Sequence, residues 1–85
     1  MNMIYNSAHY YVLEYDVQSG HDTLGCGAYE IADKAAQREA LLYGKLACRF
    51  REQARQLAEV EATQDEIDDF LGQFDGLMGQ SVTLQ

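Results

Sequence analysis

Four carboxylates crowd into five consecutive positions near the end of the chain, where they could bind a metal ion or act as acid and base. They are Asp65, Glu66, Asp68 and Asp69. A calcium loop needs alternating oxygen ligands and a placed glycine, and DEIDDFLG (65–72) has neither. Acid–base catalysis needs two carboxyl groups in contrasting environments, whereas these four do not converge on a helix. The sequence therefore predicts neither a metal site nor a catalytic site here.

The same stretch has the spacing of a helix start. Thr63 lies three residues before Glu66, which fits a capping box, in which each side chain satisfies a free backbone amide of the first turn. An apolar stripe at helical spacing follows it, made of Ile67, Phe70, Leu71, Phe74, Leu77 and Met78. Carboxylates in the opening turns interact favourably with the helix dipole. We predict a helix that begins after Thr63, with Gly76 and Gly79 as candidate terminators.

The histidines and cysteines are too scattered to indicate chemistry. His9, His21 and Cys26 are isolated, whereas structural zinc sites use four ligands in close-spaced pairs. No spacing or third group pairs either cysteine with a histidine as nucleophile and base. Cys26 and Cys48 do not form a CxxC pair, so we expect no disulfide framework and two reduced thiols. We therefore expect no catalytic residue, no cofactor and no metal, and a protein that is not an enzyme.

Length and composition limit the protein to one small folded unit. Eighty-five residues predict a single domain over 1–85 with one thin core. A hydrophobic content of 47% argues against disorder despite a net charge of -8. No apolar run approaches the roughly 18 residues that cross a bilayer, and MNMIYNS (1–7) does not resemble a secretory signal. We expect a cytoplasmic protein that does not associate with membranes.

The first third of the chain has the alternation of β-strands. Three extended runs are expected at MIYN (3–6), HYYVLEYDV (9–17) and LGCGAYEIAD (24–33), with a turn at QSGHD (18–22). In the second run we expect Tyr11 and Tyr15 to pack in the core, whereas the places of Tyr10 and Tyr29 stay open. Gly25 and Gly27 weaken the third run and indicate a bulge or a close backbone approach.

The middle block carries all six bases of the chain. Residues 1–33 and 61–85 contain no Lys or Arg, whereas 34–60 hold six bases against three acids. A helical wheel over 34–60 separates an apolar side from a polar side, which favours one helix that tolerates Gly44. The alternative is a strand through EALLY (39–43) and a helix that starts after Gly44.

The polar side of that expected helix is the candidate interaction surface. Its members are a basic ridge and two apolar side chains seven residues apart: Lys34, Arg38, Lys45 and Arg49, with Leu41 and Cys48. Such a ridge could grip nucleic-acid phosphates, but nucleic-acid binders have a net basic footprint and this chain is acidic. Acidic groups of the same chain or of a second copy are the simpler partners.

These features favour a protein-interaction or adaptor module that forms homo-oligomers. A nucleic-acid-associated regulator that uses the basic ridge is the alternative, and an enzyme ranks last because no nucleophile, base and oxyanion donors come together. The expected fold is α+β, with a small antiparallel sheet from the N-terminal strands packed against two helices. SVTL (81–84) is a candidate closing strand.

Several stretches resemble an uncharacterised betaproteobacterial family, domain of unknown function 3567. They are MIYNS (3–7), GAYEIADK (27–34) and EIDDFLGQFDGLM (66–78), and the likeness covers nearly the whole length. The family pattern has a bulkier, β-branched segment where this chain has ALLYG (40–44), and a glutamate in place of Cys48. The resemblance implies a small stand-alone bacterial protein of α+β type, and it carries over no activity, ligand or catalytic residue.

Overall fold

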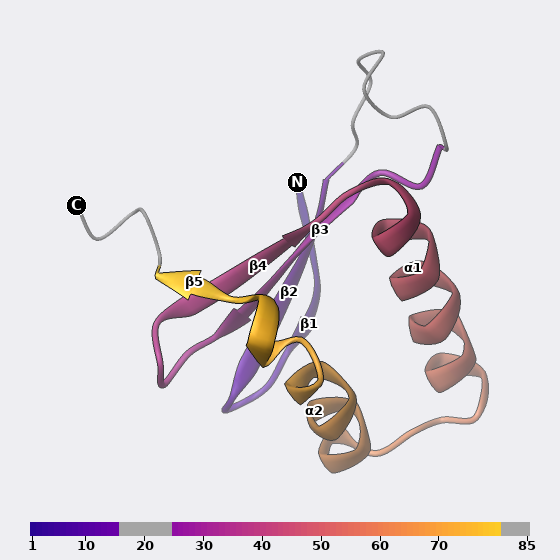
Figure 1. The fold of residues 1–85 in the computed structure, drawn as a ribbon. Helices are drawn as coiled ribbons and strands as arrows, with labels where there is room; N and C mark the ends of the chain where they lie inside the picture. Colours follow the sequence, from indigo (N-terminus) through magenta and orange to yellow (C-terminus); the bar gives the residue numbers. More distant parts are fainter. Residues whose placement is uncertain (16–24, 81–85) are drawn as a thin grey trace.

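The computed structural model describes residues 1–15 and 25–80. The elements in chain order are β1 (Asn2–Asn6), β2 (Tyr10–Tyr15), β3 (Ala28–Asp33), β4 (Arg38–Leu42), α1 (Gly44–Glu59), α2 (Gln64–Gly72), the short 3-10 helix η1 (Asp75–Leu77) and β5 (Gly79–Gln80). The strands form one antiparallel sheet in the order β1-β2-β3-β4-β5 (Figure 1). The expected α+β class, with a sheet packed against two helices, is confirmed.

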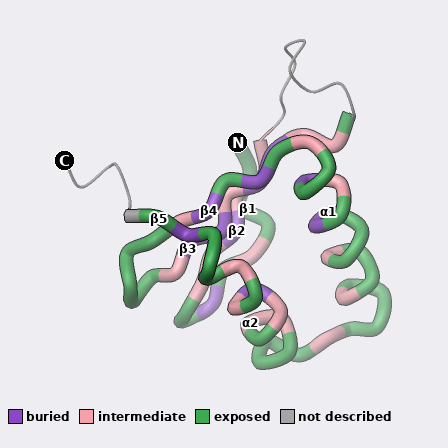
Figure 2. The backbone as a smooth tube through the Cα atoms, viewed as in Figure 1, coloured by how far each residue is buried: buried purple, intermediate pink, exposed green. Residues whose placement is uncertain are grey.

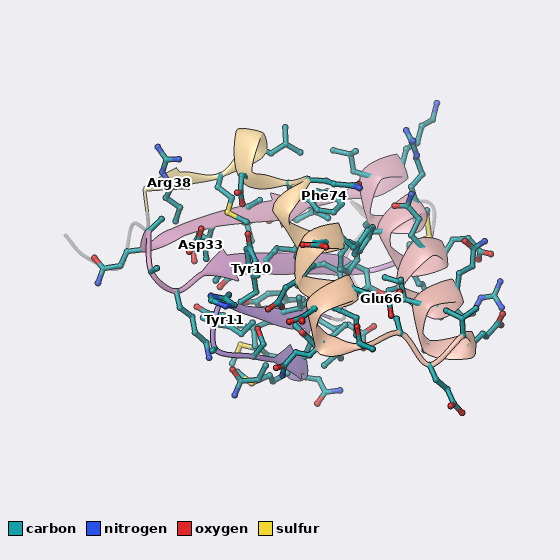
Figure 3. All side chains as sticks on the ribbon, turned by 90° about the horizontal axis from the view of Figure 1, so that it is seen from below. Tyr10, Tyr11, Asp33, Arg38, Glu66 and Phe74 are labelled. Carbon is teal, nitrogen blue, oxygen red and sulfur yellow. A yellow bond between two sulfur atoms is a disulfide. The ribbon has the colours of Figure 1, made fainter. Side chains whose placement is uncertain are left out.

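Both helices and η1 lie on the same face of the sheet (Figures 1 and 3). The buried side chains form a cluster between the two layers: Val12, Tyr29, Ile31, Ala40 and Leu42 from the strands, Ala47 and Phe50 from α1, Leu71 from α2, and Met78. The outer sides of α1 and α2 are largely exposed (Figure 2). The sheet therefore has one covered face and one face that neither helix covers.

The strand register decides which residues reach the covered face. Val12, Ile31 and Ala40 lie opposite one another in neighbouring strands and point toward the helices. Because side chains alternate along a strand, Tyr11 and Tyr15 point to the other face. The expectation that these two tyrosines pack in the core is wrong. Both sides of β2 carry large apolar residues, so its alternation could not show which side the helices cover.

Residues 34–60 do not form one helix, because the alternative of a strand followed by a helix is the observed arrangement. The Asp33 carboxylate accepts hydrogen bonds from the backbone N–H groups of Ala35 and Ala36, both at 3.1 Å, and this turns the chain after β3. β4 then pairs with β3 along its length. Gly44 has a φ of 56°, which glycine adopts without strain, at the junction of β4 and α1.

Phe50 is the centre of the contact between α1 and the rest of the core. Its ring lies 4.9 Å from that of Tyr29 on the sheet, and 5.7 Å and 5.6 Å from those of Phe70 and Phe74. The three pairs are tilted, stacked and edge-to-face in that order, and offset or edge-to-face rings at such distances attract beyond the effect of burial alone. The aromatic residues therefore connect α1, the sheet and the end of α2 in one cluster.

The predicted start of α2 is confirmed. The Glu66 backbone N–H donates to Thr63 Oγ1 at 3.2 Å, and the Thr63 backbone N–H donates to Glu66 Oε1 at 2.9 Å. These bonds to Thr63 hold the pKa of Glu66 below its usual value. The helix ends at Gly72, before the expected terminators Gly76 and Gly79, and the last residues of the apolar stripe lie in and next to η1.

Of the two glycines predicted to mark a bulge or a close backbone approach, Gly27 makes a close approach, whereas no described residue beyond its chain neighbours lies within 4 Å of the Cβ position at Gly25. The prediction is confirmed at Gly27. Its φ is 75°, and a Cβ there would lie 2.7 Å from the carbonyl oxygen of Tyr15, so a side chain would collide with β2. The expected turn at 18–22 and the strand at 81–84 lie outside the described residues. The short strand β5 pairs Gly79 and Gln80 with Glu39 and Arg38 of β4.

A disulfide joins Cys26 to Cys48, with their Cα atoms 5.2 Å apart. It connects the segment before β3 to the second turn of α1. The expectation of two reduced thiols is therefore contradicted by the structure. The sequence separation of 22 residues carries no signal for the pairing, which depends on α1 packing beside β3.

Candidate interaction surface

The face of the sheet that neither helix covers is the most distinctive surface of the described chain. We call it the open face and define it by the side chains that the register directs there: Met3, Tyr11, Leu13, Tyr15, Glu30 and Leu41. Neighbouring strands bring them together, since Met3 lies opposite Leu13, which lies beside Glu30 and then Leu41. They form one continuous patch across four strands.

The open face is apolar and accessible. Met3 and Leu41 are 52% and 50% exposed, and Tyr11, Leu13 and Tyr15 are partly buried against their neighbours. Single exposed apolar residues are ordinary on protein surfaces, but contiguous patches indicate binding. No Lys or Arg of β1 to β4 points to this patch in the described register.

One carboxylate lies at the centre of the open face. Glu30 accepts hydrogen bonds from the hydroxyls of Tyr11 at 3.4 Å and Tyr15 at 3.2 Å, one on each carboxylate oxygen. Burial, and then the charge of Glu30, raise the pKa of both tyrosines above the usual value. A cation placed here would meet a carboxylate held between two aromatic rings, which suits the side chain of Arg or Lys.

The six residues predicted as an interaction surface do not lie together. Lys34 lies in the turn after β3, where its amino group donates to Asn6 Oδ1 and to the backbone oxygen of Ser7. Arg38 lies at the end of the sheet away from α1 (Figure 3). Leu41 belongs to the open face, and Cys48 is bonded to Cys26. The predicted basic ridge is wrong because it assumed a continuous helix.

Lys45 and Arg49 are the part of the predicted ridge that survives. They lie one turn apart near the start of α1, both exposed, and neither forms an ion pair with any residue in the described ranges. Leu46 between them is 46% exposed. We call Lys45, Leu46 and Arg49 the basic end of α1. No acid lies in its first turn, where the helix dipole would favour one, so this surface is suited to an acidic partner.

The four carboxylates of the C-terminal cluster divide into two kinds. Asp65, Glu66 and Asp69 are exposed, as expected for a helix start. Asp68 instead accepts hydrogen bonds from the hydroxyls of Tyr5 at 2.8 Å and Ser7 at 2.9 Å, which holds α2 against β1. Within residues 1–15 and 25–80, no three His, Cys, Asp or Glu side chains gather in a way that could hold a metal ion.

An apolar cleft of about 160 Å³ lies between β1, α1 and α2. Its lining includes Ile4, Val12, Phe50, Leu57, Ile67 and Phe70. The described lining residues are apolar or aromatic, and none of them is charged. They therefore provide no acid–base pair or activated nucleophile.

The chain can now be compared with known proteins. A model of a family of proteins of unknown function, DUF3567, matches residues 1–85. The chain belongs to this family. Protein BTH_I0359 of Burkholderia thailandensis is 55% identical to this chain over 84 residues, which cover 99% of each of the two proteins. The resemblance inferred from the sequence is thus confirmed, and no solved structure matches.

The DUF3567 description and the relative's name specify no activity, so the geometry of the surfaces has to support a function. None of the helices in the described ranges combines the length and the apolar character that a bilayer crossing requires. The sequence alone did not predict the open face, because Glu30 and the tyrosines come together only across paired strands. The alternation of Tyr11, Leu13 and Tyr15 was the available signal, and it indicates a patch once the covered side is known.

Proposed function

We propose that this protein is a small protein-interaction module that self-associates, with the open face as its docking surface. The observation that carries the proposal is the continuous apolar and aromatic patch that faces away from both helices. A second copy that covers Met3, Tyr11, Leu13, Tyr15 and Leu41 would remove this surface from water, which is favourable at about 25 cal/mol per Å² of apolar area. An 85-residue chain buries only a small core of its own, so burial at an interface would add to its stability.

A second copy fits the distribution of charge. The chain carries a net charge of -8, and its open face centres on Glu30. The basic end of α1 supplies exposed cations without described ion pairs. One copy can therefore provide the positive charge that is missing from the open face of another. Charge complementarity of this kind orients partners and speeds their encounter more than it adds affinity.

The alternative of a nucleic-acid-associated regulator has less support. The basic ridge that suggested it is divided between a turn, the end of a strand and α1, so it cannot follow a phosphate backbone as one row. An enzymatic role also has less support, because the described polar clusters fix one element against another. We propose a role in binding, without catalysis.

We further propose that the protein acts in the cytoplasm. Disulfides are rare in that compartment except as transient or redox-sensing bonds, so the bond between Cys26 and Cys48 would be reversible there. Mass spectrometry of protein alkylated at the moment of cell lysis would report the thiol state, and full oxidation of both cysteines would contradict a cytoplasmic location.

Sedimentation equilibrium from micromolar to near-millimolar protein tests self-association. We expect the average mass to rise above 9.6 kDa with concentration. Leu41→Asp should hold the mass at the monomer value, because it places a charge in the apolar patch. Val60→Asp is the matched control, since Val60 is 73% exposed at the end of α1. A wild-type mass fixed at 9.6 kDa, or equal behaviour of the two variants, would contradict the proposal.

A further inference from the structure

The open face and the basic end of α1 are separate surfaces on opposite sides of the sheet. α1 packs on the covered face, whereas Tyr11, Tyr15 and Glu30 point away from it. One molecule therefore cannot bring its own two surfaces together. Building on the proposed function, we propose that copies join head to tail: the basic end of α1 in one copy packs on the open face of the next.

Charge argues against the simplest alternative, in which two open faces meet across a two-fold axis. In such an interface the same patch meets itself, so each copy would bring Glu30 and neither would bring a Lys or Arg from β1 to β4. The interface would then cover two carboxylates without a cation from the strands, and like charges that share an interface oppose binding. The head-to-tail contact places cations against the carboxylate instead.

The spacing of the charges fits the same contact. Lys45 and Arg49 are four residues apart, so their Cβ atoms lie roughly 5–6 Å apart on the helix surface. Glu30 lies opposite Leu41 in the sheet, and Glu39 is two residues away from Leu41 on the same strand. Such diagonal neighbours are roughly 7–8 Å apart. Two long cationic side chains can therefore reach both carboxylates.

The apolar parts of the two surfaces also correspond. Leu46 lies three residues before Arg49, so it is beside Arg49 on the surface of α1, and it would meet Leu41 and Leu13 on the open face. The charge of Glu39, like that of Glu30, raises the pKa of Tyr11 and Tyr15 after the larger effect of burial, so both acids act on the same pair of rings. A guanidinium or ammonium group above those rings would gain cation–π attraction.

A head-to-tail contact between two copies leaves one surface of each kind unused. Further copies can then add until the assembly closes into a ring, or the assembly continues as an open chain. The average mass should therefore rise beyond that of a dimer as the wild-type concentration increases.

Two variants separate the surfaces. Leu41→Asp damages the open face and leaves the basic end of α1 intact, whereas the double variant Lys45→Glu with Arg49→Glu does the opposite. All three positions are exposed, so we expect both chains to fold, and circular dichroism with thermal unfolding checks this. Each variant alone should sediment at 9.6 kDa at concentrations where the wild type associates. An equimolar mixture should form dimers of twice that mass and nothing larger, since each pair uses its only intact contact.

The outcomes distinguish this arrangement from self-association in general. If the Lys45→Glu and Arg49→Glu chain associates as the wild type does, α1 is not in the interface and the head-to-tail contact is wrong, while the proposed function stands. If the mixture of the two variants stays monomeric, the contact is wrong as well. If the wild type never exceeds 9.6 kDa, both the contact and self-association are overturned.

Discussion

Leu41 and Leu42 are neighbours on β4, yet they belong to two different surfaces. Leu42 is 1% exposed beneath α1, and Leu41 is 50% exposed on the open face. The alternation of the strand sends one side chain to each side of the sheet. A leucine therefore stabilises the core at position 42 and is available for binding at position 41.

The polar groups of the two faces differ in the same way. On the helix side, the Tyr29 hydroxyl donates to Glu14 at 2.9 Å, and the Asp68 carboxylate accepts hydrogen bonds from the hydroxyls of Tyr5 and Ser7. On the open face, Tyr11 and Tyr15 donate to Glu30 at 3.4 and 3.2 Å, and these bonds join only β2 and β3. The Asp68 bonds hold α2 against the sheet, whereas the Glu30 bonds stay within one accessible face and leave it open to a partner.

The largest expected effect is at Leu42. Leu42→Ala should lower the free energy of unfolding by roughly 2–5 kcal/mol, because it removes buried methyl groups and leaves a cavity. Denaturation in urea, followed by circular dichroism, measures the change. A loss below about 1 kcal/mol, within the range of surface substitutions, would show that the helix-covered side is not the core.

Reduction of the disulfide should cost about 3 kcal/mol in the free energy of unfolding. The bond closes a loop between residues 22 apart, and its removal increases the conformational freedom of the unfolded chain. Urea denaturation with and without a dithiol reductant gives the difference. The Cys26→Ala and Cys48→Ala double variant is the control and should not respond to the reductant; a wild type that also shows no response would mean that the bond does not form.

Alkaline pH should weaken the contact between Tyr29 and Glu14. Burial, followed by its bond to Glu14, raises the pKa of Tyr29 to about 12, against a reference value of 10.0. The stabilisation is fully present below pH 10 and is lost as pH rises toward 12, because the unfolded chain loses the proton first. Between pH 8 and 11 the wild type should lose about 1.4 kcal/mol relative to Tyr29→Phe. An equal loss in both chains would place Tyr29 in solvent.

Local signals in the sequence were enough for the parts of the fold that depend on near neighbours. The capping box at Thr63 and Glu66, and the close approach at Gly27, follow from residue types at fixed spacings. The strands β1 to β3 follow from alternation. None of these needs knowledge of what lies across the sheet.

The rest depends on contacts between distant segments. The pattern over 34–60 suits a helix, but backbone pairing with β3 and the turn made by Asp33 place 38–42 in the sheet. Tertiary pairing overrode the helical periodicity. The candidate surface failed for the same reason, since only Lys45 and Arg49 kept the predicted spacing, and Glu30 joined Tyr11 and Tyr15 only through strand register.

The smallest expected effect on stability is at Leu41, and it completes the comparison with Leu42. Leu41→Ala should change the free energy of unfolding by no more than about 0.5 kcal/mol, because half of the side chain is already in water. The same variant should weaken self-association, since it removes apolar area from the open face. Denaturation below the association range, and sedimentation above it, separate the two effects. A loss of stability as large as that of Leu42→Ala would mean that some part of the chain covers the open face in the monomer, and the distinction between the two faces would fail.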